Sequence, residues 1–181
     1  MIFETTVVSG VWVLRPEPFE DERGTLARTF CEEEFRAHGI DPHVAQCSLS
    51  CNPKPGTLRG LHLQREPYGE TKMVRCTRGE IFDVAVDLRA DSPTFGRHHS
   101  VQLSGENGFA LLMPPGVAHG FVSLVPDSDV WYQMSVPYAP DAAAGVRWDD
   151  PDLSIAWPIE RPLFVSERDR KLPVLQDWES R

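Results

Sequence analysis

Polar and ionisable side chains recur along this chain at positions where a β-sheet protein buries its residues. Residues 58–64 alternate in character, which places Leu61 and Leu63 on one face of a predicted strand and His62 and Gln64 on the other. The residues that we assign to inward positions on successive strands are Arg59, His62, Gln64, Lys72, Asp83, His119 and Tyr132. Each buried polar group without a partner costs about 1–3 kcal/mol, so a set of this size predicts a polar cavity inside a barrel.

The elements that would hold these residues are short strands separated by turns. Strands are predicted at 58–64, 72–76, 81–88, 98–103, 109–113, 119–124 and 130–136, with one or two more within 5–14. The chain also contains 16 prolines and 13 glycines, which favour many turns. This pattern predicts an all-β fold, a double-sheet jelly roll or barrel, in a single domain that spans residues 1–181.

Few helical segments are expected outside the sheets. Thr29 and Glu32 fit a capping box that begins one short helix, and Gly39 is expected to stop it. Residues 16–24 have the composition of a loop, and the tail 137–181 is expected to wrap the barrel as loops with one or two helical turns.

The charge balance excludes some classes of partner. The chain carries 18 basic and 27 acidic side chains, a net charge of −9, which disfavours binding to nucleic acid. It has neither an apolar run long enough to span a bilayer nor a secretory signal, so we expect no membrane association and a cytoplasmic location. The four cysteines form no C-x-x-C pair and are expected to be reduced thiols.

Several motifs in order along the chain resemble those of the dTDP-4-dehydrorhamnose 3,5-epimerase family. The matching segments are 19–24, 59–64, 72–75, 79–89, 114–121, 148–151 and 166–169, and the resemblance runs from about residue 3 to 175. It implies a cupin double-stranded β-helix with one or a few short peripheral helices. It also implies an isomerase that inverts carbons 3 and 5 of dTDP-4-keto-6-deoxyglucose through an enolate and gives dTDP-4-keto-rhamnose.

The resemblance assigns four catalytic residues. A ketone at carbon 4 makes the neighbouring protons acidic, so the reaction requires a base, a group that stabilises the enolate, and an acid on the opposite face. His62 matches the base, and Asp169 matches the carboxylate that orients its imidazole. Lys72 matches the cation near the ketone oxygen, and Tyr132 matches the acid that returns the proton.

The resemblance also implies a set of substrate-binding residues. Those matching contacts to the diphosphate or the sugar are Arg23, Arg59, His119 and Tyr138. Those matching positions near the base and its phosphates are Gln46 and Phe19. Asp83 matches an acidic partner of His62, Lys72 or the sugar, and Arg168 replaces a lysine before the tail aspartate. Ser48 stands where the family commonly has asparagine, which leaves the details of nucleotide contact open.

The sequence leaves several functions open. The enzyme could invert carbon 3 or carbon 5 only, or act on another nucleotide-linked 4-keto sugar. It could instead be a metal-dependent cupin, although Lys72 stands where such sites place a glutamate, and an ammonium cannot ligate a metal. A non-catalytic sugar-binding cupin would not require the four catalytic residues together. The resemblance implies neither metal nor cofactor, and a homodimer in which the N-terminal strands reach the partner's sheet.

Overall fold

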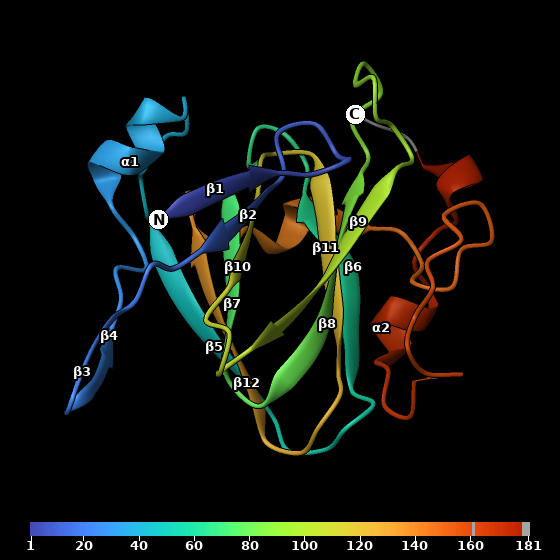
Figure 1. Ribbon diagram of the computed structural model, residues 1–181. Coiled ribbons are helices and arrows are strands. Elements are labelled where there is room, and N and C mark those ends of the chain that lie inside the picture. Colours follow the sequence, from blue (N-terminus) through green and yellow to red (C-terminus); the bar gives the residue numbers. More distant parts are fainter. Residues whose placement is uncertain (161, 179–181) are drawn as a thin grey trace.

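Two antiparallel sheets face each other in the computed structural model, which describes residues 1–160 and 162–178 (Figure 1). The six-stranded sheet has the order β1 (Ile2–Thr5), β2 (Trp12–Arg15), β10 (Ala110–Met113), β7 (Lys72–Arg78), β12 (Ser128–Met134) and β5 (Gln46–Asn52). The five-stranded sheet has the order β13 (Ala143–Gly145), β6 (Leu58–Gln64), β11 (Val117–Ser123), β8 (Glu80–Asp87) and β9 (His98–Ser104). Strands that neighbour each other in space are distant in sequence, as in a jelly roll, so the predicted fold class is confirmed.

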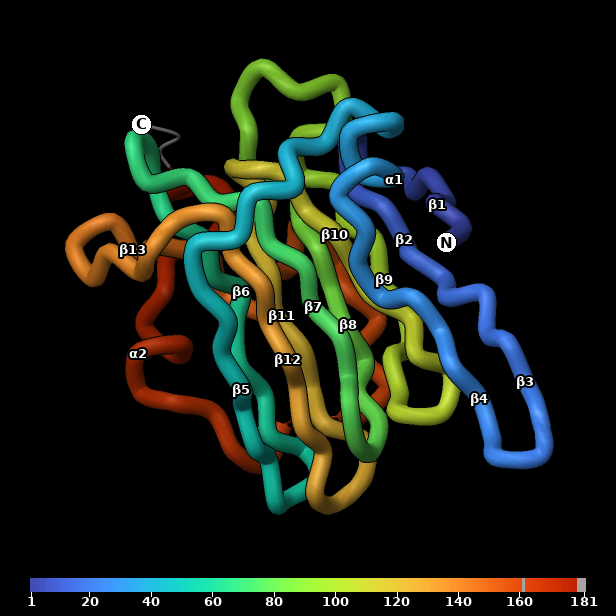
Figure 2. The backbone as a smooth tube through the Cα atoms, turned by 90° about the vertical axis from the view of Figure 1, so that its left-hand side faces the viewer, coloured from blue at the N-terminus to red at the C-terminus, as the bar shows by residue number. Residues whose placement is uncertain are grey.

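The main core lies between the two sheets, and a second one lies outside the five-stranded sheet. Along β8, Ile81 and Ala85 point into the core between the sheets, whereas Val84 and Val86 point outward. The outward residues are covered by the C-terminal tail, whose Leu153 packs in the same cluster. Both views show this tail, in orange and red, lying along the sheet (Figure 1, Figure 2).

The tail contains little regular structure, as predicted. It holds the helix α2 (Glu167–Arg170) and the 3-10 turns at Pro140–Ala142 and Leu175–Asp177, and also the short strand β13, which was not predicted and which pairs with β6. The indole of Trp178 donates a hydrogen bond to the carbonyl of Leu88 at 3.0 Å, which fastens the tail to the end of β8. Within residues 1–160 and 162–178, no helix has the length and apolar character required to cross a membrane.

Two local predictions were inaccurate. The first helix, α1 (Glu32–Ala37), begins after Cys31 and has no side-chain cap, so the Thr29 capping box is wrong. The carbonyl of Thr29 instead accepts a hydrogen bond from Arg75 at 3.1 Å, which holds that residue in the preceding connection. Gly39, at φ +73°, follows the helix end as predicted.

The N-terminal region agrees with the prediction in one respect and differs in another. The one or two strands expected near residues 5–14 are two, β1 and β2, separated by a turn at residues 6–11. The predicted loop at 16–24 contains a hairpin, β3 (Phe19–Asp21) and β4 (Gly24–Leu26), with Phe19 paired to Leu26. This hairpin projects away from both sheets in the two views (Figure 1, Figure 2).

Candidate active site

A pocket of about 560 Å³ opens at one end of the space between the sheets. The predicted site residues that line it are Gln46, Arg59, His62, Lys72, His119, Tyr132, Tyr138, Arg168 and Asp169. They come from both sheets and from α2, so the pocket exists only once the barrel and the tail are assembled. Three predicted site residues do not line it: Asp83, Arg23 and Phe19.

A β-bulge in β6 brings Arg59 and His62 to the same pocket. Strict alternation would place these two residues on opposite faces, because they are three positions apart. However, β6 pairs with β11 through His62↔His119 and Arg59↔Phe121, so that β6 has one residue more than β11 in this interval. The extra residue reverses the alternation. Gly60 is required here, since a Cβ atom would lie 2.5 Å from the Cα of Gly120.

His62 and Asp169 form a hydrogen-bonded pair at the pocket wall. The Nε2 atom of His62 lies 2.7 Å from Oδ1 of Asp169, and the second carboxylate oxygen accepts a hydrogen bond from the backbone of Gly60 at 3.3 Å. Ser166 caps α2 by accepting from the Asp169 backbone at 3.0 Å, which fixes the start of the helix that carries the carboxylate. Because Nε2 is bonded to Asp169, Nδ1 is the ring nitrogen that can act as a base.

Electrostatics keep the carboxyl of this pair ionised. Burial alone would raise the pKa of Asp169, but the hydrogen bond and charge of His62 outweigh it, with help from Gly60 and Ser166, and the pKa is lowered. An ionised Asp169 stabilises the imidazolium that forms when His62 takes a proton.

Asp83 lies behind the pocket, and its histidine partner is His119 rather than His62. Its Oδ1 is 2.7 Å from Nε2 of His119, and both side chains are almost completely buried. The pairing of β8 with β11 explains why Asp83 meets His119. Asp83 lies opposite Phe121, and His119 is two residues from Phe121 on β11, so the side chains of Asp83 and His119 are diagonal neighbours on the same face of the sheet. Burial raises the pKa of Asp83, and the nearby charges of His119 and Lys72 oppose the shift.

Tyr132 faces this second pair from the opposite sheet. Its ring meets that of His119 edge-on, with the centroids 5.9 Å apart. Burial, followed by the charge of Asp83, raises the pKa of the Tyr132 phenol. The hydroxyl is therefore protonated at neutral pH and can donate a proton.

Lys72 pairs with a carboxylate that the sequence did not single out. Its Nζ atom is 2.7 Å from Oε1 of Glu70, in the loop before β7. Glu70 also lines the pocket, and its other oxygen accepts a hydrogen bond from Gln64 at 3.2 Å. The only feature of the sequence that hints at this contact is a carboxylate two residues before an inward-facing lysine. Whether the two side chains meet depends on the conformation of the loop.

The remaining lining residues surround the pocket mouth. The Nε atom of Arg59 donates to Asn52 at 3.0 Å, which orients the guanidinium, and Gln46 accepts a hydrogen bond from the backbone of Tyr138 at 2.8 Å. Ser48 lines the pocket beside Gln46, and Arg168 lines it from α2. The mouth is thus rich in arginine, which suits an anionic ligand.

Arg23 and Phe19 lie on the projecting β3–β4 hairpin. Phe19 is 66% exposed, and Arg23 pairs with Asp21 of its own hairpin at 2.5 Å. Within this chain, therefore, neither residue is part of the pocket. Only the family resemblance had grouped them with the site.

The donor atoms of the pocket also bear on metal binding. No cluster of three or more His, Cys, Asp or Glu side chains is arranged to hold a metal ion in residues 1–160 and 162–178. The histidines of the pocket each face a carboxylate, and the ammonium of Lys72 stands beside Glu70.

Comparisons with known proteins point to one family. The family model described as dTDP-4-dehydrorhamnose 3,5-epimerase matches residues 5–177. A dTDP-4-dehydrorhamnose 3,5-epimerase from Sinorhizobium fredii is 42% identical over 175 residues, which cover 97% of this chain and 90% of the relative.

Two solved structures are similar throughout. The dTDP-4-dehydrorhamnose 3,5-epimerase of Bacillus anthracis, with TDP and PPi bound, has a TM-score of 0.91 and 38% identity, and the match covers 96% of this chain and 98% of that one. A 3′-monoepimerase from Streptomyces bikiniensis, in complex with dTDP-quinovose, has a TM-score of 0.88 and 38% identity. The match covers 94% of this chain and 86% of that one.

Proposed function

The chain belongs to the dTDP-4-dehydrorhamnose 3,5-epimerase family, and from this membership we propose that it inverts carbons 3 and 5 of dTDP-4-keto-6-deoxyglucose to give dTDP-4-keto-rhamnose. The observation that carries the proposal is the placement of the His62–Asp169 pair and Lys72 around one pocket. A base and a cation in the same cavity are what proton removal beside a ketone requires.

His62 is the base in this proposal. Its Nδ1 atom takes the proton from the carbon next to the ketone, while Nε2 remains hydrogen-bonded to Asp169. The electron pair moves toward the ketone oxygen, where the ammonium of Lys72 stabilises the enolate. Asp169 is ionised and stabilises the imidazolium until the proton leaves.

Tyr132 returns a proton from the other face. His62 lies on β6 of the five-stranded sheet and Tyr132 on β12 of the six-stranded sheet, so a sugar between them is approached from opposite sides. Burial raises the pKa of Tyr132, so the phenol is protonated at neutral pH and carries the proton that this step requires. Removal on one face and return on the other inverts the carbon, and the cycle closes when His62 releases its proton to solvent and the Tyr132 phenolate takes one up from solvent.

The nucleotide occupies the arginine-rich mouth in this proposal. Arg59 and Arg168 line it and are suited to the diphosphate, with Gln46 and Tyr138 beside them. Neither metal nor cofactor has a step in this chemistry, and metal analysis of the active enzyme tests that point. The free thiols of the four cysteines fit a reducing compartment, so we place the activity in the cytoplasm.

We further propose a homodimer in which the β3–β4 hairpin of one subunit covers the pocket of the other. Phe19 and Leu26 form an exposed apolar pair on this hairpin, and Leu49 and Trp131 form another on the outer face of the six-stranded sheet. Exposed apolar pairs on a projecting arm and on a sheet face are typical of subunit contacts. The arrangement would bring Arg23 and Phe19 to a substrate.

Inversion of carbon 3 alone is the second candidate function, and the likeness to the Streptomyces bikiniensis 3′-monoepimerase is the observation that favours it. Incubation of dTDP-4-keto-6-deoxyglucose with the enzyme in heavy water, followed by NMR, separates the two. Deuterium at carbons 3 and 5 with a rhamno product supports the double epimerase, and deuterium at carbon 3 alone supports the second candidate. No deuterium at either carbon contradicts both.

A further inference from the structure

A carboxylate without a role in the chemistry above contacts the ammonium of Lys72. Oε1 of Glu70 lies 2.7 Å from Nζ, and the two side chains are only 10% and 12% exposed. Water therefore competes weakly for this pair, in contrast to an ion pair on the surface. Both residues line the pocket, so the contact lies where substrate would bind.

Glu70 is itself held in place from behind. Its Oε2 atom accepts a hydrogen bond at 3.2 Å from Nε2 of Gln64, a buried residue that also donates to the carbonyl of Tyr68 at 3.2 Å. The amide oxygen of Gln64 accepts from the backbone of Ala139 at 2.6 Å. The carboxylate is thus one link in a chain of partnered groups, and it cannot move without breaking one of these bonds.

This chain of contacts ends at the pocket mouth. Ala139 follows Tyr138, which lines the pocket, and Gln46 holds the backbone of Tyr138 from the other side at 2.8 Å. The position of the Lys72 ammonium is therefore tied to the backbone that carries Tyr138.

We propose that Glu70 is a positioning residue that holds the Lys72 ammonium at the place where the enolate oxygen forms. The inference rests on the proposed function. A lysine side chain is long and flexible, and its ammonium has no rigid fork that would orient it alone. A displacement of about 1 Å from the reacting geometry can reduce a rate by about 100-fold, so a group that fixes the ammonium affects turnover more than binding.

The test compares Glu70→Ala and Glu70→Gln with the control Glu66→Ala. Glu66 is an exposed carboxylate of the same loop that does not line the active-site pocket. We expect Glu70→Ala to lower kcat by roughly 100-fold and to slow deuterium uptake equally, with KM and the Kd for dTDP within about 3-fold of wild type. Glu70→Gln keeps a hydrogen-bond acceptor for the ammonium, so it should retain more activity, with kcat lowered by about 10-fold. Glu66→Ala should behave as wild type.

The outcomes separate this inference from the proposed function. A wild-type kcat in Glu70→Ala overturns the positioning role. An unchanged kcat with a lower Tm and weaker binding of dTDP also overturns it, because that result would indicate a structural role only. Should Glu70→Ala not fold, the nearly isosteric Glu70→Gln decides: a selective fall in kcat supports the role, and wild-type kcat overturns it. A wild-type enzyme that incorporates no deuterium overturns the proposed function as well, whereas an active wild type with active variants overturns the inference alone.

Discussion

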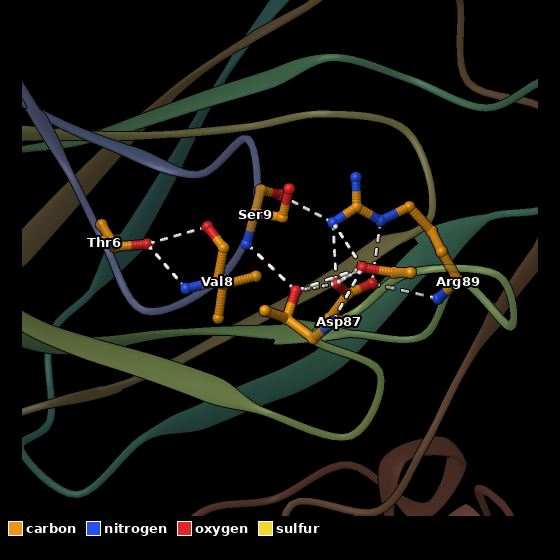
Figure 3. Close-up of polar contacts among 7 residues, drawn as sticks. Thr6, Val8, Ser9, Asp87 and Arg89 are labelled. Carbon is orange, nitrogen blue, oxygen red and sulfur yellow. Dashed lines mark hydrogen bonds and ion pairs between the residues drawn. The ribbon is translucent and has the colours of Figure 1, made fainter.

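Replacement of Asp87 by Asn should destabilise the protein by about 3 kcal/mol. Figure 3 shows the Asp87 carboxylate at the centre of a network that reaches the turn between β1 and β2. It accepts from Nε of Arg89 at 2.8 Å and from the hydroxyls of Ser92 and Thr94 at 2.5 Å each. Arg89 in turn donates to the carbonyl of Ser9 at 2.7 Å. One carboxylate thus connects the end of β8, the following connection at residues 89–94 and, through Arg89, the turn between β1 and β2.

The magnitude follows from burial. The Asp87 side chain is fully buried, whereas that of Arg89 is 29% exposed. Removal of one partner from a buried ion pair costs about 3–5 kcal/mol, and the partial exposure of the arginine places this pair at the lower end. For a chain of this length, about 3 kcal/mol corresponds to a fall in Tm of roughly 6–12 °C.

The pH dependence of the stability difference between wild type and Asp87→Asn provides a second check. Burial alone would raise the pKa of Asp87, but the hydrogen bonds from Arg89, Ser92 and Thr94 outweigh it and lower the pKa. A carboxylate whose pKa is lower in the folded state stabilises the protein above the unfolded-state pKa of about 4. That stabilisation declines below about pH 4 and is lost as the pH falls through the lower folded-state value, so the stabilities of wild type and variant should begin to converge below about pH 4.

Urea denaturation at several pH values, at one protein concentration, measures both effects. The control is Asp91→Asn, which changes an exposed carboxylate in the same connection and should alter stability by less than about 0.5 kcal/mol. If Asp87→Asn behaves like the control, or if its deficit persists unchanged at pH 3, the reasoning is refuted.

Three further changes test the site. Asp169→Asn should reduce kcat by about 1,000-fold, because an amide favours the wrong imidazole tautomer; steady-state kinetics within 3-fold of wild type would contradict this role. Gly60→Ala should lower Tm and abolish turnover, since its Cβ would lie 2.5 Å from Gly120, and a wild-type melting curve would exclude the predicted clash. The inactive variant His62→Asn, mixed with Arg23→Ala and allowed to exchange subunits, should regain activity. In a mixed dimer, one site combines the intact His62 of one subunit with the intact Arg23 of the other. No gain in activity would argue against a shared site.

Much of the sheet architecture could be predicted because alternation is a local property of extended chain. Asp83, assigned to an inward position from the sequence, lies on the same face of β8 as Ile81 of the core between the sheets, whereas Val84 and Val86 point outward. The strands around His62, Lys72, His119 and Tyr132 were also located within a few residues. Local errors occurred where a distant contact overrode a local pattern, as when Arg75 bonded the carbonyl of Thr29 and the capping box did not form.

Spacing and periodicity alone do not specify partners within the site. The resemblance matched Asp169 to His62, and the two side chains meet across 107 positions, whereas the partner of Asp83 is His119, 36 positions away. Resemblance named the residues, but the assignment of Asp83 to His119 came from the pairing of β8 with β11. The spacing of Glu70 and Lys72 in the sequence was not enough to predict their contact, because the contact depends on the path of a loop.

The sequence by itself determined where most strands run and which residues share a face within an unbroken strand, because backbone stereochemistry sends successive side chains to opposite faces whatever lies across from them. Only the tertiary structure decided which of them meet. The one-residue bulge at Gly60 turns Arg59 and His62 to the same cavity, and the tail carries Asp169 to the imidazole. Such choices depend on pairing register and packing between distant segments, which no short stretch of sequence specifies.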